Sequence, residues 1–357
     1  MTGDASNSEP APSVFHSELL GALLGPSDAV PEAEFENSLR PQRFDQFVGQ
    51  RQSVDNLRVA IRAAQERSES PDHVLLSGPP GLGKTSLARL ISIELGTTLH
   101  TTTGPALERA RDLVGILTKL KRGDVLFIDE VHRVPPAVEE YLYSAMEDYA
   151  VDLTLDQGPN ARALHLKLER FVLVGATTRE GLLSAPFRGR FGLLERLVPY
   201  PDSDLVAIVE RSARILGVAI AGEAAQVIAE RSRGTPRVAN RFLRRVRDLA
   251  QIGGATRVEC ALALDALRRL GIDQFGLEEL DRRILQCLAR NVNKALGLKT
   301  IAAAVGEAED TIEDVFEPHL LRCGFLERTS RGRMITRAGC AAIGVETAPR
   351  ADVGTIS

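Results

Sequence analysis

The chain has 357 residues, of which 44% are apolar and only 4% aromatic, and it contains no tryptophan. This length allows two or three domains with a sizeable core, and a composition of this kind is typical of a helix-rich α/β protein. No apolar run reaches the ~20 residues that a membrane span requires, and the N-terminus lacks the basic start and apolar centre of a secretory signal. We therefore expect a cytoplasmic protein that does not bind membranes.

The cysteines and the charges narrow the class of protein further. The cysteines lie far apart and form no CxxC pair: Cys260, Cys287, Cys323 and Cys340. A zinc site or a disulfide framework is therefore not expected. The net charge of −4 says little about nucleic acid, but residues 231–248 and 328–337 are strongly basic. The basic helix predicted at 237–248 either contacts DNA or carries its charges on a solvated face with ion pairs between subunits.

The first two parts of the chain differ in pattern. Residues 1–36 are rich in Ser, Pro, Ala, Gly and acid and show little periodicity, so we expect a disordered extension. Residues 37–200 alternate short apolar strands with helices, which predicts a parallel sheet covered on both faces. The predicted strands are 73–78, 97–104, 124–131, 170–178 and 192–200. Within this part, residues 148–171 alternate apolar and polar residues around a Gly-Pro-Asn turn, which predicts a projecting β-hairpin.

The rest of the chain is mostly helical. Residues 201–271 have helical periodicity throughout and predict a small all-α domain. Residues 272–345 predict three helices, the last of them unbroken over 308–324, followed by two short strands around a Ser-Arg-Gly turn. Three helices and a hairpin in this order indicate a winged helix. Residues 346–357 are expected to form a tail.

A phosphate-binding loop lies between the first strand and its helix. The segment GPPGLGKT (78–85) fits GxxxxGK[ST] in the strand–loop–helix context that this motif needs. Gly78, Gly81 and Gly83 let backbone amides turn toward a β-phosphate, aided by the helix N-terminus. Lys84 is expected to bind the β and γ oxygens, and Thr85 to place a hydroxyl on Mg²⁺. The sequence therefore predicts ATP and Mg²⁺ as cofactors.

A tandem acid ends the third strand. In VLFIDE (125–130), Asp129 is expected to position Mg²⁺ through water and Glu130 to orient and deprotonate the attacking water. Kinases and most GTPases do not need this pair, whereas ATP-driven motors and switches do. The letters DEVH also suggest the DEAD/DExH helicases, but the helical chain after residue 200 supplies no second RecA-like core. We expect His132 to pack or hydrogen bond rather than to catalyse.

Three further positions could sense the γ-phosphate. Thr177 and Thr178 end a strand beside the loop, and Arg237 in GTPR opens a helix of the small domain. Arg188 and Arg190 precede the last strand near a subunit edge, where an arginine could stabilise the transition state at a neighbour's nucleotide.

Together these segments identify a family. They read, in chain order, LRP…F…VGQ, GPPGLGKT, LFIDEVHR, MEDY, GATTR, FRGRFG and RGTPRVANR. They resemble the AAA+ ATPases, most closely the RuvB family of bacterial Holliday-junction branch-migration motors. DTIEDVFEPHLLRCGFLERT and RGR extend the resemblance, which covers about 38 to 340. One departure is Gly189, which replaces an acid usual in that family and bears on the orientation of Arg190.

The resemblance implies an AAA+ P-loop domain with a parallel sheet, an all-α lid domain and a C-terminal winged-helix domain. It implies nucleotide contacts from Leu39, Arg40, Gly81, Lys84, Thr85, Ser86, Glu147, Asp148, Tyr149, Arg190, Tyr200 and Arg237. It also implies Thr178 as the first sensor, Arg237 as the second, and Arg190 as an arginine finger acting in trans, with Arg188 as the alternative. Thr85 and Asp129 would serve Mg²⁺.

The resemblance also implies partners and an activity. Arg328, Arg331 and Arg333 would grip DNA phosphates, and the hairpin 148–171 would dock on RuvA. Six copies would form a ring that pulls the duplex arms of Holliday junctions, with the RuvC resolvase reached through the complex. The resemblance thus implies an ATP-hydrolysing motor of recombination and repair.

Three alternatives stay open at this point. An initiator-type AAA+ switch with a winged helix would bind specific sites and turn over slowly. A DNA-binding module with a vestigial ATPase is opposed by the intact Lys84, Asp129, Glu130 and Arg190. A clamp loader would not normally carry a winged helix.

Overall fold

The computed structural model describes residues 32–154, 163–292 and 294–346. The chain divides into two compact units after Arg40. Among the described residues, the first unit contains helix α2 (Glu32–Leu39). Residues 32–36 of the extension that was expected to be disordered form the first part of this helix. The remainder of that expectation lies outside the described residues.

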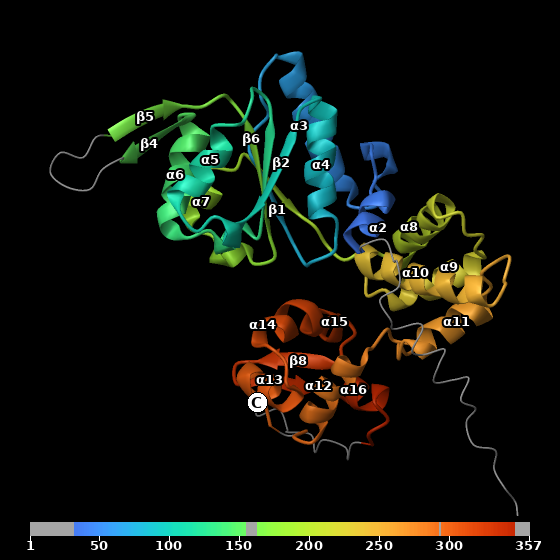
Figure 1. The fold of residues 1–357 in the computed structure, drawn as a ribbon. Helices are drawn as coiled ribbons and strands as arrows, with labels where there is room; N and C mark the ends of the chain where they lie inside the picture. The colour runs from blue at the N-terminus through green and yellow to red at the C-terminus, as the bar shows by residue number, and fades with distance from the viewer. Residues whose placement is uncertain (1–31, 155–162, 293, 347–357) are drawn as a thin grey trace, which may run out of the picture. The chain divides into compact units, whose positions relative to one another are not determined.

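The second unit contains a five-stranded parallel sheet (Figure 1). Its strands, in spatial order, are β2 (Leu99–Thr103), β3 (Val125–Asp129), β6 (Val172–Thr177), β1 (Val74–Ser77) and β7 (Leu193–Arg196). All five predicted strands are present. Every residue of β1 and β6 is buried, as a strand covered on both faces requires.

Helices cover the two faces of this sheet. The elements of this layer are η1 (Phe44–Gln46), α3 (Arg51–Glu66), α4 (Lys84–Leu95), η2 (Gly104–Ala106), α5 (Ala110–Leu117), η3 (Val131–Arg133), α6 (Pro136–Glu147), η4 (Glu180–Leu182) and α7 (Ala185–Arg188). Alternate residues of β1 enter two different cores: Val74 and Leu76 pack with α3 and α4, whereas Leu75 packs with α5 and α6.

A two-stranded hairpin extends from this layer (Figure 1). It consists of β4 (Ala150–Thr154) and β5 (Ala163–Lys167), paired antiparallel with Asp152 opposite His165. The predicted hairpin is thus present in its strands, while its turn lies outside the described residues.

The predicted all-α segment is a four-helix bundle. It comprises α8 (Asp202–Ile215), α9 (Gly222–Arg231), α10 (Pro236–Ile252) and α11 (Cys260–Arg269). On α10, Phe242, Val246 and Ala250 recur every four residues and are buried, as an amphipathic helix requires. On its polar face, Arg241 pairs with Glu278 and Arg245 with Asp248.

The C-terminal segment is a winged helix. It comprises α12 (Glu279–Ala289), α13 (Leu298–Val305), α14 (Glu309–Thr311), the π-helix η5 (Ile312–Phe316), α15 (Glu317–Arg322), β8 (Leu326–Thr329), β9 (Gly332–Ile335) and α16 (Arg337–Ala342). The helix predicted over 308–324 is present over 309–322, but its middle turn is a π-helix. Pro318 lacks an amide hydrogen and crowds the preceding turn, so the helix widens into a π-turn just before it. Helix α16 was not predicted.

A buried ion pair joins the lid to the winged helix. Arg233, before α10, donates to Asp281 of α12 at 2.5 Å and to the carbonyl of Gly276 at 2.9 Å. Arg233 is 8% exposed and Asp281 is fully buried. Burial raises the pKa of Asp281 to about 6, against the pull of Arg233.

Among the described residues, no helix combines the length and apolar character that crossing a membrane requires.

Candidate functional site

The phosphate loop follows β1 in a backbone conformation that only glycine adopts easily. Gly78, Gly81 and Gly83 have φ values of 132°, 77° and 105°. A side chain at Gly78 would also collide with the backbone, because its Cβ would lie 2.4 Å from the carbonyl oxygen of Leu197. The loop then enters α4 at Lys84, so its amides and the helix N-terminus converge on one spot suited to an anion.

Lys84 is buried at this spot without a carboxylate partner. Its side chain is 8% exposed, and its ammonium donates to the carbonyls of Gly78 at 2.8 Å and Pro79 at 2.9 Å. Burial lowers its pKa to about 8, although Asp129 pulls the other way. No salt bridge to Lys84 is recorded in the described ranges. A buried cation held only by carbonyls fits the phosphate oxygens that the sequence predicts.

Residues from the lid and from the chain before it close around the loop. The amide of Arg237 points to the carbonyl of Gly81 at 3.5 Å, and the hydroxyl of Tyr200 donates to the carbonyl of Leu82 at 3.1 Å. Two predicted nucleotide contacts, Arg237 and Tyr200, therefore lie at the loop. Thr85 and Ser86, in the first turn of α4, are half-buried there.

The acid pair ends β3. Asp129 accepts the amide of Glu130 at 2.9 Å, and Glu130 adopts a left-handed φ of 49°. The Glu130 carboxylate is half exposed and pairs with Arg133 at 3.2 Å. The Asp129 carboxylate and the Thr85 hydroxyl supply oxygen atoms, the kind of donor that Mg²⁺ prefers either directly or through its bound water. These residues therefore fit the predicted metal.

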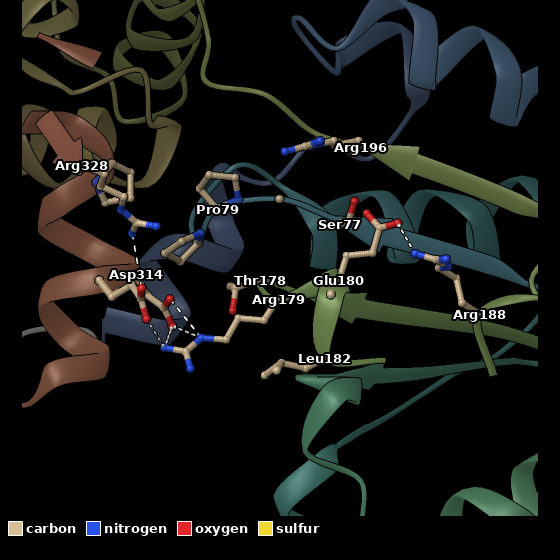
Figure 2. A pocket seen from close by; sticks show the side chains of 15 residues that line it. Ser77, Pro79, Thr178, Arg179, Glu180, Leu182, Arg188, Arg196, Asp314 and Arg328 are labelled. Carbon is tan, nitrogen blue, oxygen red and sulfur yellow. Dashed lines mark hydrogen bonds and ion pairs between the residues drawn. The ribbon is translucent and has the colours of Figure 1, made fainter. Parts of the chain in front are cut away.

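The two threonines that end β6 have different surroundings. The hydroxyl of Thr177 is 3.0 Å from His132 Nδ1 and accepts the amide of Arg179 at 2.9 Å, and the residue is 1% exposed. The prediction that His132 forms a hydrogen bond is thus confirmed. Thr178 instead lines a cavity of about 780 Å³ together with Ser77 and Gly78 (Figure 2). Thr178 is thus open to a cavity beside the start of the phosphate loop, whereas Thr177 is enclosed, and the sensor role of Thr178 stays a prediction.

Arg179 was missed by the sequence analysis. Its Nε donates to both carboxylate oxygens of Asp314 at 3.1 Å (Figure 2). Its terminal nitrogen donates to Asp310 at 2.8 Å. These hydrogen bonds raise its pKa. The acids lie in the winged helix, so the residue after the sensor threonine contacts that domain directly. The acidic run of 307–314 was the one available signal.

A second group of predicted residues lies away from the loop. Arg190 pairs with Glu147 at the end of α6 at 3.2 Å, and Asp148 and Tyr149 follow directly. Arg190 is two residues from Gly192, which lies directly against Asp72. A Cβ atom added at Gly192 would be 2.6 Å from the Cβ atom of Asp72.

Asp72 precedes β1, whereas the phosphate loop follows it. Strands rise about 3.3 Å per residue, so the four residues of β1 separate the two groups. Among the described residues Arg190 makes no contact with the loop of its own chain, whereas Arg188, the alternative finger, lines the cavity that also contains Gly78 and Pro79. Leu39 and Arg40 belong to the N-terminal unit, and their adenine contact stays a prediction.

The three arginines of the wing are not equivalent. Arg328 and Arg333 donate to Glu317 at 2.7 and 3.0 Å, and both donate to Glu313 at 3.3 Å. Burial works against ionisation of Glu317, but the hydrogen bonds from these arginines hold its pKa below the usual value. Arg333 is 15% exposed. Arg331, at the turn, is exposed and has no ion pair recorded in the part of the chain that is described.

Comparisons with known proteins agree with this architecture. Three family models match in order: the Holliday junction DNA helicase RuvB P-loop domain over 39–197, the RuvB AAA lid domain over 200–273 and the RuvB C-terminal winged helix domain over 274–344. Proteins named Holliday junction branch migration complex subunit RuvB from Chlorobaculum tepidum and Myxococcus xanthus are each 54% identical, over 86% and 87% of this chain and 89% and 91% of theirs.

A solved structure is similar along the same length. The Thermotoga maritima RuvB Holliday junction branch migration motor superposes with a TM-score of 0.80 at 45% identity, over 87% of this chain and all of that one. With a P-loop, lid and winged helix in this order, the chain belongs to the RuvB family of AAA+ proteins.

Proposed function

We propose that this chain is the ATP-driven motor subunit of a branch-migration complex, which pulls the duplex arms of Holliday junctions during recombination and repair. The observation that carries the proposal is the position of two complementary half-sites at opposite ends of β1. One is the loop with the buried Lys84, and the other is the group around Arg190 and Glu147. Within one chain the two half-sites do not form a whole site, so two copies arranged head to tail would be needed to form one. Six copies in this arrangement would close a homohexameric ring.

Each residue of the site would have a separate role in ATP hydrolysis. Lys84 and the loop amides would hold the β and γ phosphates, and Thr85 and Asp129 would hold Mg²⁺, which offsets phosphate charge when bound. Glu130 would orient the attacking water and accept its proton, and Thr178 would contact the γ-phosphate. Such positioning and charge stabilisation account for most of the catalysis in phosphoryl transfer.

Residues from two other parts of the ring would complete the cycle. Arg190 of the neighbouring chain would stabilise the charge that develops on the γ-phosphate. Arg237, whose amide already lies at the loop, would lose its contact with that phosphate after hydrolysis, and the lid that carries Arg237 would then change position. The lid and the winged helix bound to it through Arg233 would then move along the DNA.

DNA contacts would come mainly from the wing. Arg331 presents an unpaired charge to phosphates, while Arg328 shares its charge with Glu317. Contacts of this kind are independent of sequence and sensitive to salt, which suits a motor that must cross any sequence. The hairpin of β4 and β5, with Leu164 exposed, would dock on RuvA, and RuvC would be reached through that complex.

A synthetic four-way junction with long homologous arms tests the proposal. The chain is added with its matching RuvA and Mg·ATP, beside the Lys84→Ala and Glu130→Gln variants, and separation into two duplex products is followed. Products that require ATP, RuvA and both residues are expected. ATP hydrolysis and tight, site-specific duplex binding without products would instead indicate an initiator-type switch.

A further inference from the structure

We propose that Tyr143 is a positioning residue for Arg190, and that Glu139, Tyr143 and Glu147 form a stripe on α6 which presets the arginine for a neighbour's nucleotide. Residues spaced by four lie on the same face of a helix. All three contact Arg190 or the short helix α7 that leads to it. The inference rests on the proposed function, because it concerns the arginine that would act in trans.

Three groups surround the guanidinium of Arg190. Its central carbon lies 4.2 Å from the centre of the Tyr143 ring, well within the range of a cation–π contact. One terminal nitrogen donates to the carbonyl of Pro186 at 2.8 Å, and the other donates to Glu147 at 3.2 Å. The side chain is therefore only 21% exposed. Its Nε is buried and, among the described residues, has no hydrogen-bond partner.

Tyr143 is itself fixed to the segment that carries Arg190. Its hydroxyl is hydrogen-bonded to Glu139 and lies 3.0 Å from the hydroxyl of Ser184. Ser184 also bonds to Glu139 at 2.5 Å and caps α7 by accepting the amide of Phe187. The rings of Tyr143 and Phe187 are 5.8 Å apart. Tyr143 therefore sets the position of α7 and supports the arginine that follows it.

Because position 189 is a glycine and not an acid, the acidic partner of Arg190 is Glu147. Gly189 has an ordinary right-handed conformation, so its backbone does not require glycine. Without an acid there, Glu147 supplies the one salt bridge recorded for Arg190 in the described part of the chain. A phosphate arriving from a neighbour must displace this carboxylate, whereas the uncharged ring of Tyr143 can stay beneath the guanidinium. The ring is thus suited to hold the arginine in both states.

The test is the ATPase activity of the full chain on duplex DNA, with kcat and KM measured separately. Tyr143→Leu should lower kcat about tenfold, since a cation–π contact of this quality corresponds to roughly that factor in rate. The KM for ATP should change less than about twofold, because the loop that binds ground-state phosphates is untouched. Tyr143→Phe should restore most of kcat, because it keeps the ring face. Tyr141→Leu, on the same helix but away from Arg190, is the matched control and should behave as wild type.

Mixed rings add a readout that a merely structural role would not give. Adding the inactive Lys84→Ala variant, whose Arg190 cradle is intact, to Tyr143→Leu should raise the rate per Tyr143→Leu subunit. Thermal melts establish folding, and Tyr143→Met, whose flexible unbranched side chain fills irregular space without a ring, replaces the leucine variant if that one fails to fold.

The outcomes separate the two proposals. An unchanged kcat in Arg190→Ala would overturn the arginine finger of the proposed function. A large loss in Arg190→Ala together with a normal Tyr143→Leu would overturn the positioning role alone. A Tyr143→Phe variant as slow as Tyr143→Leu would overturn the cation–π role of the ring, since the hydroxyl bonded to Glu139 would then carry the effect.

Discussion

Replacing Lys84 with methionine should stabilise the nucleotide-free protein while abolishing ATP binding. The methionine keeps the length of the side chain and removes a buried charge. The pKa of Lys84 falls from 10.5 to about 8, and at 1.36 kcal/mol per unit the burial costs roughly 3 kcal/mol. The ammonium also makes two hydrogen bonds to loop carbonyls, and losing them offsets the gain by about 1 kcal/mol each. A net stabilisation of about 1–2 kcal/mol remains.

The stability gain expected for Lys84→Met depends on pH. The folded protein binds this proton less tightly than the unfolded chain does, so the full cost is present below the folded pKa of about 8. The cost declines as pH rises from about 8 toward the ordinary value of 10.5 and is absent above it. The advantage of Lys84→Met should therefore be largest at pH 7 and smaller at pH 9.5.

Urea unfolding without nucleotide measures this difference at both pH values. Lys119→Met, on the exposed surface, is the matched control and should not change the midpoint. The reasoning is refuted if Lys84→Met is less stable than wild type at pH 7, because the loop would then bind the ammonium favourably even without phosphate.

Three further predictions concern the loop, the wing and the buried ion pair. Phosphates should raise the pKa of the loop lysine again, so ATP binding above pH 8 should take up a proton, seen as a buffer-dependent heat in calorimetry. Arg331→Ala should reduce the slope of log K for duplex binding against log salt concentration by about 0.9. Arg333→Ala should mainly lower the unfolding midpoint, because Glu317 loses a partner. Equal salt slopes for the two variants would count against this assignment. Asp281→Ala should cost about 3 kcal/mol of unfolding free energy, the low end for a broken buried pair, because the carboxylate contact that Arg233 keeps is the longer one of 3.4 Å with Glu278. A loss below about 1 kcal/mol would contradict it.

The parts of the site that the sequence predicted are those set by local chain geometry. GPPGLGKT needs only a strand before it and a helix after it, and both neighbours were visible as patterns. The end of β3 at Asp129 follows from a short apolar run, and the hairpin strands follow from the alternation of apolar and polar residues. The π-turn in the last helix could also have been expected, because Pro318 stands inside the predicted span.

The parts that escaped prediction depend on residues far apart in the chain. Arg179 meets Asp314 across 135 positions, and no local pattern relates them. The sequence suggested that Arg333 is a free basic residue, but it forms an ion pair with the buried Glu317, 16 positions away. The clustering of Glu147 with Arg190 follows from α6 running back along the sheet, which requires the topology rather than the composition.

The buried pair of Arg233 and Asp281 has a mechanical consequence. Separating such charges without water costs several kcal/mol, so the lid and the winged helix act as one stiff lever. In the cycle proposed above, these two parts would move together, and that movement would also have to break the ion pairs that join Arg179 to Asp310 and Asp314 of the winged helix.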